Sequence, residues 1–412
     1  MEREYYDDLE TRSTDEREAA HMAALPETIA LAQRRAPALG RSLADVDPME
    51  VRDRAALARL PVTRKADLLE RQAEEPPFGG FAAVAPGELS RIFMSPGPIF
   101  DPEGGQPDYW RFARALWATG LRPGHVVHNC FAYHFTPAGS MFETSAHAIG
   151  AAVFPAGTGQ TELQVQAIAG VRPDCYCGTP DFLKVIIEKA EEMGRDISSI
   201  RMAHVTAAAF MPDVKAFYAA RGLNVLQSYG TADLGMVAYE STARDGMILD
   251  ERVIVEIVRP GTGDPVPEGE VGEIVVTVLN RTYPLIRYAT GDLTAVLPGA
   301  SPCGRTNTRI RGWMGRADQT TKVKGMFVHP SQVAEVLRRH QIAGRGRLVV
   351  DRAEGADVMT LQVEAPAAGG GLAEAVAETL RAVTKLRGEV EVVAPGTLPN
   401  DGKVIDDRRK YD

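Results

Sequence analysis

In the first two thirds of the chain, short continuous runs of hydrophobic residues alternate with stretches in which hydrophobic residues recur at helical spacing. This alternation extends from about residue 90 to about residue 240. Residues 125–131 predict a buried strand, residues 141–149 a helix, and residues 151–154 the next strand. Such an alternation of strand and helix is typical of a parallel sheet with covering helices.

The hydrophobic pattern changes again before the C-terminus. Over residues 253–258 and 272–279 the period becomes two, which predicts a smaller β-rich subdomain. Helical and strand-like stretches beyond residue 315 predict a small α+β domain, in which Ser331 should cap a helix. We therefore predict an α/β protein with a large N-terminal domain over residues 1–315, rich in parallel sheet, and a small C-terminal domain over residues 316–412.

Composition and charge narrow the class of protein. The 412 residues, 44% of them hydrophobic, are typical of a globular protein with two or more domains. A net charge of −9 argues against a general nucleic-acid binder, whose footprint would be basic. No apolar run approaches the roughly 20 residues of a membrane helix, and the acidic start does not resemble a secretory signal. With only four cysteines, we expect a reduced, cytoplasmic protein without nucleic-acid or membrane partners.

Four polar, glycine-containing segments lie in the second half of the chain, at residues 228–233, 283–293, 315–325 and 398–406. Taken singly, each is more easily interpreted as a turn, a hairpin or a solvated loop. Together they meet the needs of a protein that activates a carboxylic acid with ATP. In that reaction the acid attacks the α-phosphate, and a lysine and Mg²⁺ can stabilise the extra negative charge of the transition state.

The segment Ser228-Tyr-Gly-Thr-Ala-Asp233 offers candidates for contacts with adenine, phosphate and metal. Tyr229 presents a ring for adenine, and Gly230 lets the backbone approach a ligand. The Thr231 hydroxyl can hydrogen-bond a phosphate oxygen. The Asp233 carboxylate can hold Mg²⁺.

The later segments offer a carboxylate and two cations. Asp292, in a Thr-Gly-Asp sequence after a strand, can accept hydrogen bonds from both ribose hydroxyls. Arg316 can contact the nucleotide, and Lys403 supplies a cation for the phosphate. In this order, the four segments resemble the signature of adenylate-forming enzymes.

The sequence resembles the phenylacetate–coenzyme A ligase branch of the acyl-adenylate-forming superfamily over nearly its whole length. Residues 57–68, 177–183 and 325–333 resemble further stretches of that branch. The resemblance implies two half-reactions at one site, with ATP, Mg²⁺ and coenzyme A as cofactors. Asp318 would be the hinge of a mobile C-terminal domain, which brings Lys403 to the α-phosphate and then withdraws it to open a tunnel for coenzyme A. Because the family is often dimeric, a homodimer is a further expectation.

One stretch departs from the family's pattern. The family's phosphate loop is rich in Ser, Thr and Gly and carries a lysine, whereas residues 94–105 here keep only Ser95 and Gly97 as candidate phosphate contacts. Two prolines remove backbone donors. Asp101 and Glu103 would repel a triphosphate unless Mg²⁺ intervenes. A subgroup with a modified loop and a degenerate enzyme are both compatible with this departure.

The resemblance places the acid pocket between the strand after residue 125 and the helix after residue 140. An aromatic stretch there suits a flat, apolar acid. The candidate lining residues are Tyr133, His134, Phe135, Ala138 and Gly139. His134 could polarise a substrate group or be a structural histidine in an aromatic cluster.

The hypothesis that unites these observations is ATP-dependent activation of an aromatic or arylacetic acid to acyl-AMP, followed by transfer to coenzyme A. Lys403, Thr231 and Asp233 would carry the catalysis. One alternative is an acyl-adenylating enzyme that loads a carrier-protein thiol. Another is a catalytically silent nucleotide- or acyl-binding protein, although retention of Lys403 and Asp318 argues against it.

Overall fold

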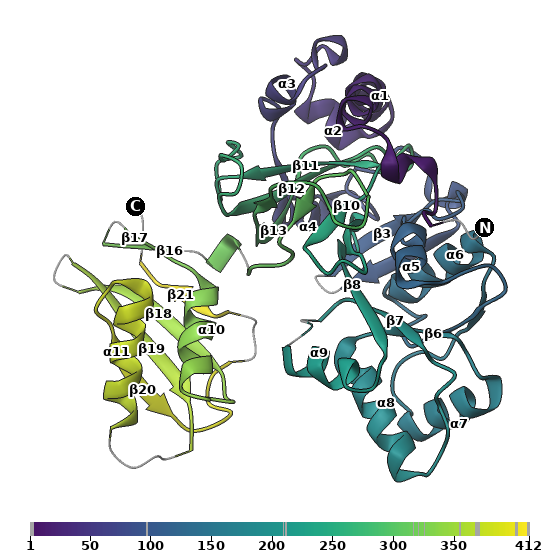
Figure 1. The fold of residues 1–412 in the computed structure, drawn as a ribbon. Coiled ribbons are helices and arrows are strands. Elements are labelled where there is room, and N and C mark those ends of the chain that lie inside the picture. Colours follow the sequence, from purple (N-terminus) through teal and green to yellow (C-terminus); the bar gives the residue numbers. More distant parts are fainter. Residues whose placement is uncertain are drawn as a thin grey trace. The chain divides into compact units, whose positions relative to one another are not determined.

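A computed structural model describes residues 4–95, 98–208, 210, 212–315, 317–319, 321–324, 326–353, 356–366, 371–399 and 403–409 (Figure 1). The chain divides into two compact units. One comprises Met1–Thr290 and Thr294–Gly312, and the other comprises Gly291–Leu293 and Trp313–Asp412. Within the described ranges, no helix is long and apolar enough to cross a membrane.

The first unit contains a nine-stranded sheet in the order β14-β15-β10-β9-β8-β7-β6-β4-β5. Five adjacent strands of this sheet run parallel. They are β4 (Val126–Asn129), β5 (Ala152–Phe154), β6 (Cys175–Gly178), β7 (Met202–Val205) and β8 (Asn224–Thr231). The antiparallel extension consists of β9 (Gly235–Glu240), β10 (Met247–Leu249), β14 (Val296–Leu297) and β15 (Arg309–Ile310).

Helices cover both faces of the parallel strands, because alternate side chains of each strand point to opposite faces. On one face, α5 (Ala113–Thr119) and α6 (Ala138–Ile149) share a core with Cys175 and Cys177. On the other face, Tyr176 packs with helices α7 (Thr161–Val171), α8 (Pro180–Glu192) and α9 (Pro212–Ala219). The α/β fold class that the hydrophobic pattern predicted is thus confirmed.

A second sheet in the first unit has the order β1-β13-β12-β11. The antiparallel pair β11 (Val253–Val258) and β12 (Gly272–Val278) corresponds to the stretches with a period of two. The short β1 (Thr63–Arg64) pairs in parallel with β13 (Tyr288–Thr294). All of β12 is buried, so this sheet is covered on both faces.

The N-terminal segment packs against this second sheet. Its long helix α1 (Thr14–Arg35) begins with a capping box formed by Ser13 and Glu16. Leu25 and Ile29 of this helix share a core with Ile254 and Val276 of the sheet. The remaining elements before residue 90 are η1 (Asp8–Thr11), α2 (Pro37–Ser42), η2 (Pro48–Glu50), α3 (Arg54–Ala58), α4 (Lys65–Glu74) and η3 (Pro86–Glu88).

The stretch compared with a phosphate loop contains a β-hairpin. Strand β2 (Arg91–Ser95) pairs antiparallel with β3 (Ile99–Glu103), and Ser95 lies opposite Ile99. Residues 96–98 alone connect the strands, and two of these lie outside the described residues. Asp101 and Glu103 are both buried on β3. The acidic residues therefore point into the protein.

The second unit is a small α+β fold. Its four-stranded sheet has the order β20-β19-β18-β21, and Figure 1 shows α10 and α11 lying over it. Its elements are η4 (Ala317–Gln319), β16 (Thr321–Val323), β17 (Met326–Val328), α10 (Pro330–Arg339), β18 (Gly346–Ala353), β19 (Ala356–Glu364), α11 (Leu372–Thr384), β20 (Glu389–Val393) and β21 (Ile405–Asp407).

The predicted N-cap in this unit is wrong. Helix α10 begins at Pro330, and its N-cap is His329 rather than Ser331. Proline suits the first helical turn because it has no N–H to leave unpaired. The Gln332 side chain accepts the backbone N–H of His329 at 3.0 Å, so Ser331 lies inside the helix.

Candidate active site

The predicted nucleotide segment lies where β8 of the large sheet ends. Tyr229, Gly230 and Thr231 are the last residues of this strand. Tyr229 is buried, and a bulge in the pairing with β9 follows it. A Cβ on Gly230 would lie 2.5 Å from the carbonyl oxygen of Gly235, so close packing with β9 already requires glycine there.

Thr231 and Asp233 shape the turn between β8 and β9. The Thr231 hydroxyl accepts the N–H of Leu234 at 3.1 Å. Asp233 has a side chain only 1% exposed, and its Oδ2 lies 3.1 Å from Nζ of Lys65. Among the described residues, Oδ1 of Asp233 accepts no hydrogen bond of standard geometry. The candidate metal ligand is thus a buried carboxylate with one oxygen paired and the other available.

Lys65 is a site residue that the sequence analysis missed. It is the first residue of α4, and its side chain is 39% exposed. A positive charge at a helix N-terminus opposes the helix dipole. The position of Lys65 at the start of an expected helix thus favoured an anionic neighbour, but nothing in the sequence identified Asp233 as that neighbour.

Asp101 is a second buried carboxylate beside Asp233. It is fully buried on β3. Burial raises the pKa of Asp101 well above its usual range, and the carboxylate of Asp233 adds to the effect. Ser95 and Lys65 partly oppose this rise in pKa. The β2–β3 hairpin therefore contributes the carboxyl group of Asp101 to the surroundings of Asp233, whereas the family's loop contributes a lysine.

Two buried tyrosine hydroxyls complete this polar centre. Burial raises the pKa of Tyr288, and Asp233 is the second cause. Burial likewise raises the pKa of Tyr283, with smaller effects from Asp233 and Asp101. Both hydroxyls stay protonated at neutral pH. They are neutral groups and do not supply the positive charge that the family's loop lysine would bring to a bound phosphate.

The ribose candidate Asp292 lies on β13 but groups with the second unit. Its Oδ1 accepts a hydrogen bond from Nε1 of Trp313 at 2.9 Å. Neighbouring backbone bonds join Leu293 to Met314 and Gly315. The Asp292 carboxylate is therefore held by the segment that precedes the expected hinge.

Lys403 is a surface residue of the second unit. Its side chain is 58% exposed, and Nζ lies 3.8 Å from Oδ1 of Asp406. The Gln319 side chain accepts the N–H groups of Val404 and Ile405. Asp318 lies in η4, directly before Gln319, and the structure describes its backbone only. Gly97 and Arg316 lie outside the described residues.

The predicted acid-pocket residues lie between β4 and the first turn of α6. The Asn129 side chain donates to the hydroxyl of Tyr133 at 2.8 Å and to the carbonyl oxygen of Gly139 at 2.9 Å. Burial raises the pKa of Tyr133, as does the nearby Glu143. A Cβ on Gly139 would collide with the carbonyl of Ala132. This loop is thus held by Asn129 and by close backbone packing.

The aromatic stretch is only partly buried. Phe131 stacks on Phe142 inside the core, whereas His134 and Phe135 are exposed. Ala138 is half-buried at the start of α6. His134 contacts the ring of Phe135 edge-on. It therefore lies on the surface, apart from the buried aromatic side chains.

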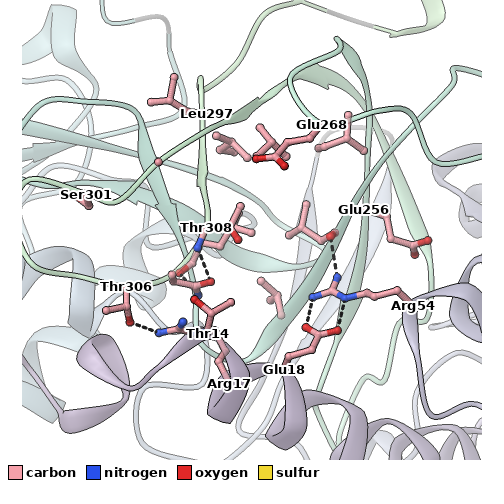
Figure 2. A pocket seen from close by; sticks show the side chains of 18 of the residues that line it. Thr14, Arg17, Glu18, Arg54, Glu256, Glu268, Leu297, Ser301, Thr306 and Thr308 are labelled. Atoms are coloured by element: carbon pink, nitrogen blue, oxygen red, sulfur yellow. Dashed lines mark hydrogen bonds and ion pairs between the residues drawn. The ribbon is translucent and has the colours of Figure 1, made fainter.

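A cleft of about 770 Å³ lies elsewhere in the first unit (Figure 2). It runs between α1 and the second sheet, and none of the predicted site residues lines it. Arg54 there makes two 2.8 Å hydrogen bonds to Glu18 and also donates to the carbonyl of Val255. Arg17 is bonded to Thr306 and Glu251. Because none of the predicted site residues lines this cleft, the polar centre at Asp233 is the better candidate site.

Comparison with known proteins places the chain in a family. Residues 109–279 match the family model described as AMP-binding enzyme, and residues 325–409 match its C-terminal domain. The chain is 32% identical over 375 residues to a phenylacetate-coenzyme A ligase of Thermus thermophilus, covering 85% of this chain and 83% of that protein. A phenylacetate-coenzyme A ligase of Escherichia coli is 32% identical over 379 residues, covering 87% and 84%.

Solved structures agree with this placement. The structure of 2-hydroxyisobutyryl-CoA ligase in an open conformation, in complex with 2-HIB-AMP and CoA, superposes with a TM-score of 0.83 at 26% identity. The match covers 100% of this chain and 95% of that one. The fold and the comparisons define an AMP-binding enzyme of the acid–thiol ligase class. The chain belongs to its phenylacetate–coenzyme A ligase-like branch.

Proposed function

We propose that this enzyme uses ATP to activate a carboxylic acid and transfers the acyl group to coenzyme A. Family membership supports this reaction, since two relatives that match over most of their length are named phenylacetate-coenzyme A ligases. The observation in the chain itself that carries the proposal is the ion pair between the partly exposed Lys65 and the buried Asp233, two residues after the end of the strand that carries Tyr229–Thr231. These groups offer a cation for phosphate and a carboxylate for a metal near the end of the strand that carries Tyr229.

The first half-reaction joins the acid to AMP. A carboxylate oxygen attacks the α-phosphorus of ATP, the bond to the bridging oxygen breaks, and pyrophosphate leaves. Lys403 stabilises the charge that develops on the α-phosphate. Asp292 accepts the ribose hydroxyls. Lys65, which is exposed enough to leave Asp233, pairs with the departing phosphates in place of the missing loop lysine.

The expected Mg²⁺ fits the residues present, because Oδ1 of Asp233 is a buried carboxylate oxygen that accepts no standard hydrogen bond from the described residues. Bound there, Mg²⁺ would neutralise phosphate charge. In the second half-reaction the sulfur of coenzyme A attacks the acyl carbon. AMP leaves, and the thiol proton passes to solvent.

The acid is proposed to be aromatic or arylacetic. The relatives named for phenylacetate support this class, and so does the aromatic stretch around Tyr133. A second candidate is a small 2-hydroxy acid, because 2-hydroxyisobutyryl-CoA ligase matches over the whole chain. A homodimer and a cytoplasmic location stay predictions, checked by light scattering and cell fractionation.

The test is acid-dependent release of AMP from Mg-ATP, with and without coenzyme A, across benzoic, phenylacetic and 2-hydroxy acids. Release that requires both acid and coenzyme A supports the proposal and ranks the acids. Release that needs a carrier-protein thiol instead identifies the carrier-loading alternative. Failure of ATP to bind in calorimetry would overturn the proposal and leave the silent binding protein.

A further inference from the structure

The β2–β3 hairpin is held from both sides at one pair of residues. Met94 of β2 and Phe100 of β3 lie directly opposite each other. The N–H group of each donates to an acceptor outside the hairpin, as expected of a non-hydrogen-bonded pair in an antiparallel ladder. The groups that hold the two strands at this pair therefore come from other parts of the protein.

The outer partner of Phe100 is the side chain of Gln72 in helix α4. Its Nε2 donates to the carbonyl oxygen of Phe100 at 2.9 Å, and its Oε1 accepts the N–H of the same residue at 2.7 Å. Gln72 is buried. One side chain thus makes the two backbone bonds that a neighbouring strand would otherwise make, and it fastens β3 to α4.

The outer partner of Met94 is the loop that carries the predicted acid-pocket residues. The N–H of Met94 donates to the carbonyl oxygen of Phe135 at 2.7 Å. Phe135 has a φ of 63°, and the N–H of Thr136 donates to the carbonyl of His134 at 2.9 Å. A γ-turn with a positive φ at its central residue is the rare, strained form. Such a turn persists only where the surrounding structure holds it, and the bond from Met94 reaches it from outside the loop.

The hairpin needs these outer contacts, because a two-stranded hairpin by itself is marginally stable. The far end of β3 is fastened by Glu103, whose carboxylate accepts from Trp110 at 2.8 Å and from Ser140 at 2.6 Å. Nearer the connection at residues 96–98, Gln72 holds the hairpin on one side and the Phe135 loop bonds it on the other. Loosening one side should therefore loosen the other.

We propose that Gln72 is a positioning residue of the acid pocket. Acting through Phe100 and Met94, it holds the turn at Phe135 in the conformation that receives the acid. The ring of Phe135 is 67% exposed, so the backbone of the turn sets where the ring points. The assignment of Phe135 to an acid pocket rests on the proposed function, whereas the bonds that join Gln72 to this loop do not.

The first experiment measures hydrogen exchange of single amides in the full-length protein. In Gln72→Leu the amide of Phe100 loses its acceptor and should exchange at least tenfold faster. The amide of Met94 does not bond to Gln72, but it should exchange at least fivefold faster if the Phe135 loop is released. Unchanged exchange at Met94 would mean that Gln72 does not act across the hairpin, and would overturn the inference.

The second experiment measures AMP release from Mg-ATP with phenylacetate as the probe. Gln72→Leu should raise the KM for phenylacetate at least fivefold, while kcat and the KM for ATP change less than twofold. Gln33→Leu is the matched control, because Gln33 of α1 also donates to two backbone carbonyls, those of Leu43 and Val46, at 2.8 Å. It should alter none of these constants. Similar changes in both variants would indicate a general loss of stability and overturn the assigned role.

Phe135→Gly tests the route of the effect. Glycine adopts a positive φ without strain and keeps the carbonyl that accepts from Met94. The relieved turn should depend less on the hairpin, so Gln72→Leu should raise the KM for phenylacetate by a smaller factor in this background than in the wild type. Equal factors would overturn the route. If Gln72→Leu fails to fold, Gln72→Glu replaces it, because it still accepts the N–H of Phe100 but cannot donate to its carbonyl.

Failure of this inference is distinguishable from failure of the proposed function. Hydrogen exchange needs no substrate, whereas AMP release needs both ATP and acid. AMP release that depends on phenylacetate, with an unchanged KM in Gln72→Leu, would overturn only the role of Gln72. Faster exchange at Met94 in a protein that releases no AMP would overturn the reaction and the acid pocket, and would leave only the structural bridge.

Discussion

At the scale of single residues, buried carboxylates differ in how they are stabilised, and this sets their expected behaviour. Glu103 has three donors, Asp233 has one lysine, and Asp108 has the hydroxyl of Ser145 and the N–H of Ala113. Burial raises the pKa of Asp108 to about 6 in spite of these donors. Asp108 therefore makes the stability of the protein depend on pH.

We predict that Asp108→Asn removes part of this pH dependence. Because the pKa is raised in the folded protein, Asp108 stabilises the fold most below its unfolded pKa, and this contribution is lost as pH rises from about 4 to about 6. The corresponding free energy is about 3 kcal/mol. Urea unfolding at pH 4.5 and 7.5 should show a smaller loss in the variant. An equal loss in both proteins would contradict the prediction.

Lys403 carries the residue-scale prediction for catalysis. Lys403→Ala should slow acyl-AMP formation by a factor of about 10² or more, because a charge-stabilising donor in the transition state is lost. Thioester formation from supplied acyl-AMP should largely persist. Single-turnover assays of the two half-reactions make the comparison. Lys385→Ala, at the end of α11, controls for loss of a lysine in the same unit, and equal losses in both half-reactions would exclude the assigned role.

At the scale of elements, Arg287 of the 283–293 segment fastens the N-terminal segment to the second sheet. Its guanidinium is buried and pairs with Glu256 at 3.0 Å. It also donates to the carbonyl oxygens of Ala58, Leu60 and Gly263 at 2.6–2.7 Å. Arg287, which lies in a segment predicted to bind the nucleotide, thus stabilises the packing of the fold.

We predict that Arg287→Met lowers the free energy of unfolding by about 3–5 kcal/mol, because Glu256 is left buried without its partner. The double variant Arg287→Met with Glu256→Gln should recover part of the loss, since no uncompensated charge remains. Denaturant unfolding of the wild type, of Arg287→Met, of Glu256→Gln and of the double variant measures the coupling. Strictly additive effects would mean that the ion pair contributes nothing.

The Gln319 side chain joins η4 to the backbone that directly follows Lys403. Gln319 accepts the N–H groups of Val404 and Ile405. Gln319→Ala should therefore speed hydrogen exchange of these two amides and slow acyl-AMP formation about tenfold, because loss of positioning typically reduces catalysis. Gln332→Ala is a control glutamine in the same unit, and it should alter neither measurement. Unchanged exchange in Gln319→Ala would refute the attachment.

At the scale of the whole molecule, the candidate residues are divided between two compact units. Tyr229, Thr231 and Asp233 belong to the first, whereas Asp292 and Lys403 belong to the second. A single arrangement of the units need not serve both half-reactions, and alternation about a hinge would resolve this. Asp318, in the short η4 of the second unit, is the predicted hinge.

We predict that Asp318→Pro impairs the two half-reactions unequally, because proline fixes φ and removes a backbone donor. Acyl-AMP formation and thioester formation are again measured separately in single turnovers. Asp318→Ala, which keeps backbone freedom, should behave more like the wild type. Equal effects on both half-reactions would argue against a hinge at this position.

The amino-acid sequence by itself determined the fold class and the family. Helical spacing, period-two stretches and glycine punctuation are local properties, so they predicted the parallel sheet and its covering helices, the β-rich part and the α+β part. The order of the four segments is also readable along the chain, and it indicated the family that the comparisons then showed. Local signals failed at a helix start, where Ser331 was expected to be the N-cap but the helix begins at Pro330 with His329 as its N-cap.

Only the tertiary structure decided which distant residues meet. Lys65 and Asp233 are 168 positions apart, and nothing local to either predicts their ion pair. The same holds for Asp101, whose acidic character was visible in the sequence but whose burial beside Asp233 was not. Periodicity reports which face of an element is buried, whereas the partners of a buried charge depend on how sheets, hairpins and turns pack.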